Sequence, residues 1–440
     1  MPEKQLWGGE TTKAVDNFPI SGETVPVSVV RWLARVKGAA ALVNGELGLL
    51  DKRRAASIAK GAAEIAAGKH DSQFPIDVFQ TGSGTSTNTN ANEVIAALAG
   101  SGVHPNDHVN MGQSSNDVFP SAVHLAALDV AQNELLPALR QLERSFAKKS
   151  KSFQNVVKSG RTHLMDAVPV TLGQEFGGYA AQIALGQERV RSALEHVGQI
   201  PLGGTATGTG LNTHPKFAEK VRARLKKESG LRQIAAPLDR FEAQASRDAL
   251  VELSGALKVV AVSLSKIAGD LALMGSGPRA GIGEIRLPEL QKGSSIMPGK
   301  VNPVIPEVVL QVSAQVIGND TAITVGGMQG QFELNVRIPL LARNLLQSLH
   351  LLASTSRVFA EKCVDGIEVN RAGCEASAGA TLAAATALNS AIGYDKGTTI
   401  VKRATDSGRP LREIALEEGV DAKLYDATID LRKIARGNQV

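Results

Sequence analysis

The stretch 246-SRDALVELSGALKVVAVSLSKIAGDLALM-274 decides which fold this sequence can adopt. Its apolar residues recur at alternating steps of three and four positions: Leu250, Leu253, Leu257, Val260, Leu264, Ile267, Leu271 and Met274. This spacing gives a helix one apolar edge, and the edge continues as a coiled-coil-like seam over about four heptads. The sequence therefore predicts a long helix that packs along its whole length against partners of similar length.

Two further stretches carry the same pattern. Around 172–197 the apolar positions are Leu172, Phe176, Tyr179, Ile183, Val190, Leu194 and Val197. Around 121–149 they are Leu125, Leu128, Leu135, Leu139, Leu142 and Phe146. We expect more helices at about 307–325 and 338–363. Together these helices predict an elongated bundle whose seam continues across subunits.

The composition agrees with packed helices. The chain has 440 residues, more than one core usually supports, and it combines 44 glycines with an aromatic content of only 4%. Small side chains let helices approach closely, whereas sandwiches and barrels rely on aromatic residues. We expect a mainly α fold of three regions: a mixed, mostly helical N-terminal domain at 1–112, a long-helix bundle at 113–366 and a small helical C-terminal domain at 367–440.

Several classes of protein are disfavoured. The net charge of +5 is spread along the chain, without the basic clusters and interleaved aromatics of nucleic-acid proteins. Cys363 and Cys374 are the only cysteines, so we expect buried small side chains rather than disulfides or a thiolate metal site. No run approaches the roughly 20 apolar residues that cross a bilayer, and the start of the chain lacks a signal-peptide pattern. These features predict a cytoplasmic protein.

Five stretches rich in Gly, Ser, Thr and Asn lie between the expected helices: 80–93, 104–117, 160–175, 201–214 and 292–307. Several lead into a helix, and Pro120 and Pro306 suit a first helical position. Helix N-termini bind anions readily, although each stretch alone could be only a turn. In 293-GSSIMPGKVNP-303, Lys300 beside Gly-rich backbone is a good seat for a carboxylate or phosphate. Neither a Walker A nor a Rossmann pattern is present.

The run 293-GSSIMPGKVNP-303 resembles the signature of the fumarase/aspartase superfamily, and the chain is similar to the class II fumarate hydratases within it. The resemblance covers almost the whole chain, in the family's order: 80-QTGSGTSTNTNANEV-94, 104-HPNDHVN-110, 113-QSSNDVFP-120, 160-GRTHLMDAVPVTLGQEF-176, 201-PLGGTATGTGLNTHP-215, 276-SGPRAGIGEI-285 and 332-FELNV-336. The fold implied is a fumarase/aspartase-like, three-region fold whose central helices form a multi-subunit helical core.

A few positions separate fumarases from aspartate ammonia-lyases, which remain the main alternative. His163 stands where aspartases typically have Gln, Ser115 where they have Thr, and Gly299 where they usually have Ala. The segment 303-PVIPEVV-309 is more similar to the aspartase version, but it flanks the site without changing the reactive groups. A catalytically silent scaffold is a third alternative, which the intact set of reactive residues disfavours.

The resemblance implies reversible anti addition of water to fumarate giving L-malate, by acid and base catalysis without a metal or cofactor. It places Ser294 as the base at carbon and His163, with Glu307, as the group that activates water. The implied substrate-binding residues are Ser83, Gly84, Thr85, Ser114, Ser115, Asn116, Thr162, Ser295, Lys300, Val301 and Asn302. It also implies a homotetramer in which loops from three subunits complete each site.

The segment 104-HPND-107 corresponds to a second, non-catalytic anion site in the family. The residues implied are His104, Pro105, Asn106 and Asp107. The basic residues that usually precede this segment are replaced here by 100-GSGV-103 in a shortened loop. His104, Asp107 and His108 have no further His or Cys ligand nearby, so we expect no metal there.

Overall fold

The computed structural model describes residues 4–437, and the chain divides into two compact units. Unit 1 consists of Met1–Ala138, Gly186–Val262 and Val312–Ser354, and unit 2 of Leu139–Leu185, Ser263–Gln311 and Thr355–Val440. The predicted regions 1–112, 113–366 and 367–440 are continuous ranges of the sequence, whereas each of the two units is built from several separate segments. These regions stay a prediction, and their outermost residues, 1–3 and 438–440, lie outside the described part.

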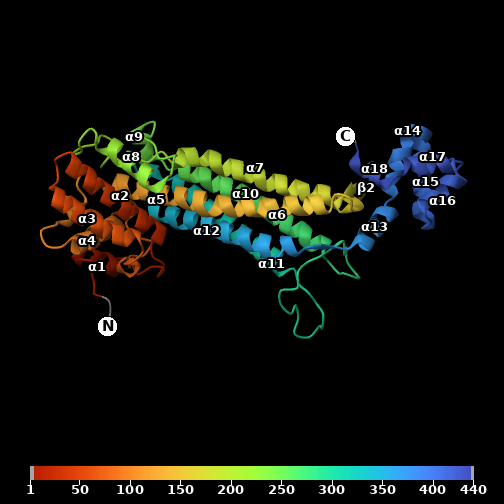
Figure 1. Cartoon of the computed structure of the whole chain (residues 1–440), viewed down its shortest axis with the longest axis horizontal. Helices are drawn as coiled ribbons and strands as arrows, with labels where there is room; N and C mark the ends of the chain where they lie inside the picture. Colours follow the sequence, from red (N-terminus) through yellow and green to blue (C-terminus); the bar gives the residue numbers. More distant parts are fainter. Residues whose placement is uncertain (1–3, 438–440) are drawn as a thin grey trace. The chain divides into compact units, whose positions relative to one another are not determined.

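The secondary structure is mainly helical (Figure 1). Unit 1 contains α1 (Gly9–Asn17), α2 (Val27–Glu46), α3 (Lys52–Ala66), η1 (Asp71–Gln73), α4 (Thr85–Ala99), η2 (Pro105–Val109), α5 (Ser115–Val130), η3 (Ala131–Leu135), α8 (Phe217–Ser229), α9 (Arg240–Ala245), β4 (Gly330–Gln331) and β5 (Leu334–Asn335). Unit 2 contains β1 (Val157–Thr162), β2 (Met165–Thr171), β3 (Ile285–Arg286), η4 (Val364–Gly366), β6 (Glu368–Val369), α13 (Arg371–Ala380), η5 (Leu382–Leu388), α14 (Asn389–Ile392), α15 (Tyr394–Ser407), α16 (Leu411–Glu417), α17 (Ala422–Thr428) and α18 (Leu431–Arg436). The long helices α6 (Leu136–Ser152), α7 (Leu172–Val197), α10 (Asp248–Met274), α11 (Val304–Gly327) and α12 (Ile338–Lys362) contribute a segment to each unit.

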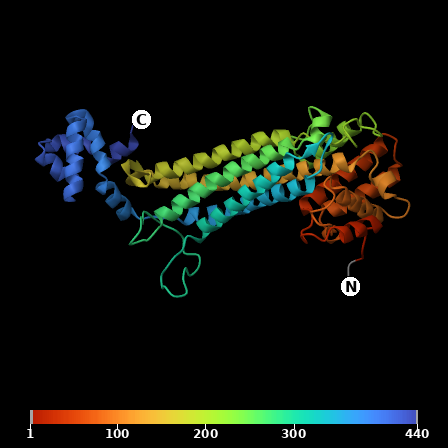
Figure 2. The ribbon, with the colours of Figure 1, turned by 180° about the vertical axis from the view of Figure 1, so that it is seen from behind.

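The long helices confirm the apolar spacing read from the sequence. Helix α10 ends at Met274, as predicted, and every residue of its predicted stripe is at most 5% exposed. Helix α7 has the predicted bounds, and its stripe is also buried. Within each unit the segments of these helices run side by side, as two opposite views show (Figures 1 and 2).

The start of α5 and the prolines differ from expectation. The third helix was expected around 121–149, but α5 begins at Ser115 and is interrupted by the π-helical turn η3 before α6. Pro120 therefore lies inside α5 and Pro306 is the third residue of α11. The prediction of a first position was wrong for Pro120 because Ser114 caps α5 with its side chain, which starts the helix before the proline. It was wrong for Pro306 because α11 begins two residues earlier, at Val304. The segment 160–175, expected as a loop, is largely the β1–β2 hairpin.

Unit 1 is held together by polar contacts as well as apolar burial. Asp320 on α11 accepts a hydrogen bond from Ser254 of α10 at 2.7 Å and pairs with Lys258 at 2.6 Å. Asn319 of α11 donates to Ser348 of α12 at 3.1 Å. Since these groups lie along otherwise apolar helix faces, they fix the register of α10, α11 and α12 in this unit.

Unit 2 contains a cluster of five aromatic residues. The rings of Phe146, Phe153, Phe176, Tyr179 and Phe359 lie with centroids 5.3–6.0 Å apart in tilted or edge-on pairs. Such pairs contribute beyond their buried area. The C-terminal helices pack around a separate core that includes Leu388, Ile400 and Ile414. Cys363 and Cys374 are free and buried, which confirms the expectation that they are small core side chains.

The bundle helices also carry apolar side chains that one chain leaves exposed. On α11 these are Val308, Leu310, Ile317 and Val325, and on α10 they are Val259, Val262 and Leu273. A run of exposed valine and leucine along long helices is typical of a surface that another helix covers. No helix within residues 4–437 is long and apolar enough to cross a membrane.

Candidate active site

In unit 1, two helix N-termini meet through their hydroxyl groups. Helices α4 and α5 start at Thr85 and Ser115, and the Oγ1 of Thr85 lies 2.8 Å from the Oγ of Ser115. Ser83 continues the chain of hydroxyls, with its Oγ 2.7 Å from Thr85 Oγ1. The positive ends of two helix dipoles and several hydroxyl donors thus face one place, which suits a carboxylate.

Gly84 is required for this approach. It caps α4 with a φ of 76°, and a Cβ there would lie 2.2 Å from the ring of Phe119. An L residue would therefore meet both a disfavoured backbone conformation and a clash with α5.

Asp117 is the buried support of the 113–117 segment. One carboxylate oxygen accepts from the backbone N–H of Ser114 at 2.9 Å, and the other accepts from the N–H groups of Gly203 and Thr205 at 2.9 and 3.1 Å. Burial raises the pKa of this carboxyl to about 6, although its backbone hydrogen bonds oppose the shift. Asn116, one residue away, donates to the carbonyl of Ala206 at 2.9 Å. Asp117 thus ties the start of α5 to the 201–214 loop.

Lys37 lies beneath the same segment. It is fully buried in α2 and donates to the side-chain oxygens of Asn110 and Gln113 at 3.1 and 3.2 Å. Burial lowers its pKa to about 7, while the negative charge of Asp117 acts in the opposite direction. A buried ammonium and carboxylate of opposite charge thus support the backbone that presents Ser114, Ser115 and Asn116.

In unit 2, His163 occupies the tip of the β1–β2 hairpin. Thr162 ends β1 and pairs with Met165, so His163 and Leu164 form a two-residue turn. Both have positive φ, 57° and 61°. Tight hairpin turns of this kind normally use Asn and Gly, and a bulky residue there costs on the order of 1–3 kcal/mol. The turn presents the imidazole at an exposed position.

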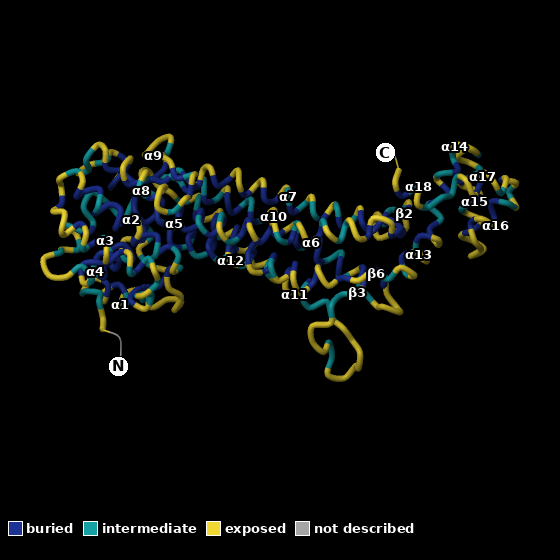
Figure 3. The backbone as a smooth tube through the Cα atoms, viewed as in Figure 1, coloured by how far each residue is buried: buried dark blue, intermediate teal, exposed yellow. Residues whose placement is uncertain are grey.

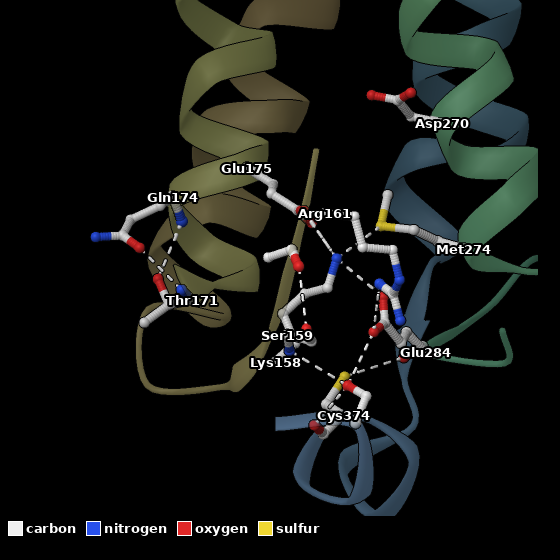
Figure 4. A network of polar contacts seen from close by, with 12 residues as sticks. Lys158, Ser159, Arg161, Thr171, Gln174, Glu175, Asp270, Met274, Glu284 and Cys374 are labelled. Atoms are coloured by element: carbon white, nitrogen blue, oxygen red, sulfur yellow. Dashed lines mark hydrogen bonds and ion pairs between the residues drawn. The ribbon is translucent and has the colours of Figure 1, made fainter. Parts of the chain in front are cut away.

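His163 also lines a cavity of about 650 Å³ in unit 2. The β1 residues Lys158 and Arg161 line the same cavity, as do Glu175 and Tyr179 of α7. The hairpin tip therefore lies next to a polar cavity with a charged wall, some of which Figure 4 shows.

The 293–303 loop surrounds the oxygen of Ser294 with backbone donors. Ser294 Oγ accepts from the N–H groups of Ile296 and Met297 at 3.2 and 3.0 Å. The loop is closed by the Gly293 N–H, which donates to the carbonyl of Lys300 at 3.0 Å. A Cβ at Gly293 would lie 2.1 Å from that carbonyl oxygen, so only glycine closes the ring in this way.

The other predicted residues of this loop are placed as follows. Ser295, Lys300, Val301 and Glu307 are exposed, and Ser294 and Asn302 are half-buried. The Asn302 side-chain nitrogen donates to the carbonyl of Gly293 at 2.7 Å, which supports the loop and leaves the amide oxygen free to accept. Figure 3 shows the loop as exposed over most of its length.

Some predicted site residues come together in one unit, and others do not. Ser83, Thr85 and Ser115 form one hydroxyl network in unit 1. In the part of unit 2 that the structure describes, no hydrogen bond or ion pair joins His163 to Glu307 or to Ser294. The pairing of His163 with Glu307 stays a prediction.

At the predicted second anion site, the side chains contact one another. His104 Nδ1 lies 3.1 Å from a carboxylate oxygen of Asp107, and the His104 N–H donates to His108. Pro105 begins η2, and Asn106 is exposed. The Asp107 carboxylate already pairs with the His104 imidazole, which is the group that a bound anion would contact. Anion binding at this segment stays a prediction. Among residues 4–437 there is no cluster of three or more His, Cys, Asp or Glu side chains that could hold a metal ion.

Sequence reasoning missed the buried charges that support these segments: Lys37 and Asp117 in unit 1, and Lys158 and Glu284 in unit 2. A signal was present for Lys37, a lone charge on the apolar face of 27-VSVVRWLARVKGAAALV-43. A lone charge on such a face is buried only with a partner. No comparable signal marks Glu284, because its partners come from distant parts of the chain.

Comparisons with known proteins place the chain among lyases. A family model described as Lyase matches residues 1–318, and one described as Fumarase C C-terminus matches residues 385–436. A class II fumarate hydratase of Corynebacterium glutamicum is 56% identical over 437 residues, covering 98% of this chain and 92% of that protein. The class II fumarate hydratase of Mycobacterium tuberculosis is 52% identical over 448 residues, covering all of this chain and 94% of that protein.

Solved structures agree. The structure of recombinant class II fumarase from Schistosoma mansoni matches with a TM-score of 0.96 at 36% identity. The match covers 99% of this chain and 96% of that chain.

Proposed function

The chain belongs to the class II fumarate hydratase family of hydro-lyases and has its mainly helical fold; on this premise we propose how its residues add water to fumarate, reversibly and in the anti sense, to give L-malate. In the dehydration direction a proton leaves the carbon next to a carboxylate, the electrons move into that carboxylate, and the hydroxyl group leaves as water. The stabilisation of the doubly charged carboxylate is the largest demand on the site.

Helix N-termini, hydroxyls and an ammonium meet this demand. In unit 1 the starts of α4 and α5 supply Thr85, Ser115 and the dipole ends, which favour negative charge. Lys300 supplies a compact positive charge with several donors. Ser83, Gly84, Ser114, Asn116, Thr162, Ser295, Val301 and Asn302 complete the proposed substrate contacts. No carboxylate belongs to the set that binds substrate, since it would repel both ends of a dicarboxylate.

The observation that carries the proposal is the environment of Ser294. An ordinary serine hydroxyl is too weak a base to remove the proton from carbon. Two backbone N–H groups, of Ile296 and Met297, point at its oxygen and stabilise that oxygen most when it is negatively charged. This geometry lowers the cost of forming an alkoxide, which is the form that accepts the proton.

His163 is proposed to act on the opposite face of the substrate. It donates a proton to the leaving hydroxyl group and takes it back from water in the hydration direction, and Glu307 stabilises the protonated ring. The strained turn supports this role, since strain at an exposed residue is retained where function needs that position.

Substitution of the two proposed groups tests these roles. Ser294→Ala and His163→Asn should each lower kcat by on the order of 10² or more, measured by fumarate absorbance. His350→Asn, an exposed histidine outside the site, is the control and should retain normal rates. Near-normal kcat in both site variants would remove the proposed roles. Turnover of L-aspartate without turnover of L-malate would replace the hydratase with an ammonia-lyase.

We also propose that the protein is a homotetramer with sites shared between subunits. The exposed valine and leucine side chains on α10 and α11 support this, because long helices with a second apolar face are stable when other copies cover it. Sharing would also allow Glu307 of one subunit to reach His163 of another. Light scattering at micromolar concentration should give the tetramer mass, and a fully active monomer would refute the arrangement.

The proposed location is the cytoplasm, which suits the two free cysteines.

A further inference from the structure

A cluster of four charged side chains, two of them on β1, adjoins the hairpin that carries His163 (Figure 4). The Lys158 ammonium lies 2.7 Å from Glu175 and 2.9 Å from Glu284, and the Arg161 guanidinium lies 2.9 Å from the other oxygen of Glu284. The side chain of Glu284 is completely buried and that of Lys158 is 2% exposed. The two positive and two negative charges balance.

Stability alone does not explain this cluster. Removing charges from water costs several kcal/mol per ion, and apolar side chains of similar volume often give an equal or greater stability. A buried ionic cluster does, however, fix geometry, because its ion pairs and hydrogen bonds tolerate only small displacements.

A β-bulge brings both cations to one carboxylate. Residues three apart on a regular strand point to opposite faces, yet Lys158 and Arg161 both reach Glu284. The register of β1 against β2 shifts between Ser159 and Gly160, which turns the following residues. Gly160 permits the bulge, since a Cβ there would lie 2.5 Å from the carbonyl oxygen of Val168. The local irregularity therefore serves the contact with Glu284.

Glu284 is itself anchored on both sides. Its N–H donates to the carbonyl of Met274, at the end of α10, and its carbonyl accepts from the N–H of Asn370, each at 2.9 Å. Its carboxylate also accepts from Ser377 of α13 at 3.0 Å. The residue is thus a fixed point, held by α10 and by the segment that leads into α13.

Glu284 is connected to the hairpin tip through Arg161, which it binds and which lies two residues before His163. Arg161 is followed by Thr162 and then by His163, whose positive φ must be imposed by its surroundings. We propose that Glu284, acting through Arg161 and Lys158, is a positioning residue that holds His163 in place for the reaction. The inference rests on the role of His163 under the proposed function.

Glu175 offers a matched control within the same cluster. It also binds Lys158, but its side chain is 27% exposed and it makes no hydrogen bond or ion pair with Arg161. If the loss of any buried charge were enough to disturb the site, Glu175→Gln and Glu284→Gln would behave alike. If the path through Arg161 matters, only Glu284→Gln should affect catalysis strongly.

The test compares Glu284→Gln, Arg161→Lys, Glu175→Gln and His163→Asn in the full-length protein. Binding sites are counted by calorimetric titration with succinate, and kcat is expressed per succinate site, so that unfolded protein does not contribute. Glu284→Gln and Arg161→Lys should each lower kcat per site about tenfold or more, the scale that a small misplacement of a reactive group produces. The KM for L-malate and the Kd for succinate should change less than about threefold, and Glu175→Gln should keep kcat within about twofold.

The outcomes separate the two ideas. A full kcat per site in Glu284→Gln, with His163→Asn inactive, overturns the positioning role and leaves the proposed function intact. A fully active His163→Asn overturns the proposed role of His163 itself. If Glu284→Gln does not fold, Arg161→Lys decides, because it keeps the charge and alters only the geometry; a full kcat per site in that variant also overturns the inference.

Discussion

Replacement of Asp117 with Ala is the sharpest test of how the unit 1 part of the site is supported. The change leaves three backbone N–H groups without their acceptor: the buried groups of Gly203 and Thr205 and the partly buried group of Ser114. Each unpaired donor costs roughly 1–3 kcal/mol, or about 6 kcal/mol together at the middle of that range. The pKa of this carboxyl is about 6, against an ordinary 3.8, so at neutral pH the cost of burying its charge exceeds the stabilisation of that charge by its neighbours by about 3 kcal/mol, and the substitution returns this amount. The expected net loss is about 3 kcal/mol.

Asp51→Ala is the matched control. Asp51 also caps a helix and accepts from two backbone N–H groups, of Arg53 and Arg54, but it is exposed, so its loss should cost about 1 kcal/mol. Urea unfolding followed by circular dichroism measures both losses, and steady-state assays should show a raised KM only in Asp117→Ala. If Asp117→Ala costs no more than Asp51→Ala, the three hydrogen bonds do not support the segment as argued.

Two further predictions concern His124 and Gly293. His124 is buried, its Nδ1–H donates to the carbonyl of Val197, and burial lowers the pKa of its imidazole from 6.5 to about 3. Between these two pH values the folded state binds fewer protons than the unfolded state. The free energy of unfolding therefore decreases as the pH falls below 6.5. At pH 5 this loss is about 2 kcal/mol. Between pH 7 and pH 5 the urea midpoint should therefore fall less in His124→Asn than in the unmodified protein or in the control His350→Asn. Equal falls in all three proteins would contradict this prediction. Gly293→Ala should lower kcat/KM at least about tenfold with an unchanged thermal midpoint, because the added Cβ disrupts the exposed loop that positions Ser294. The control is Gly255→Ala in α10, where a Cβ meets nothing within 4 Å, and this variant should keep full activity.

The long helices could be predicted from the sequence because their signal is local. Each apolar stripe, such as the one from Leu250 to Met274, is complete within one segment, and burial of the stripe needs only some partner, not a particular one. The composition of the donor-rich loops was informative for the same reason. Residue type and the following helix start are enough to indicate a place for an anion.

The burial of Asp117 and Glu284 could not be predicted because their partners are distant in the sequence. Asp117 is held by Gly203 and Thr205, and Glu284 by Lys158 and Arg161, more than 80 residues away in each case. In the sequence, such residues look like ordinary solvated charges. Only the fold shows that they are buried.

The turn at His163 was missed for a different reason. Hairpin turns with positive φ are recognised by Asn or Gly, and His163–Leu164 carries neither. The sequence has the opposite local preference, so tertiary contacts must impose the conformation. Sequence rules fail here at a residue that the proposed mechanism uses, which is where such failures are expected.

The two parts of the site are supported in opposite ways, and the difference suits their proposed tasks. Ser115 and Asn116 are supported by the buried Asp117, so the proposed carboxylate-binding groups of unit 1 are in place before substrate arrives. Little conformational entropy is therefore lost on binding. Ser294 lies in an exposed loop that is closed by its own hydrogen bonds rather than by a core. A loop of this kind can move as a unit while the donors to its serine oxygen stay in place. Under the proposed mechanism, Ser294 can therefore approach the substrate carbon while it keeps its two backbone donors, and its approach would exclude water from the developing charge.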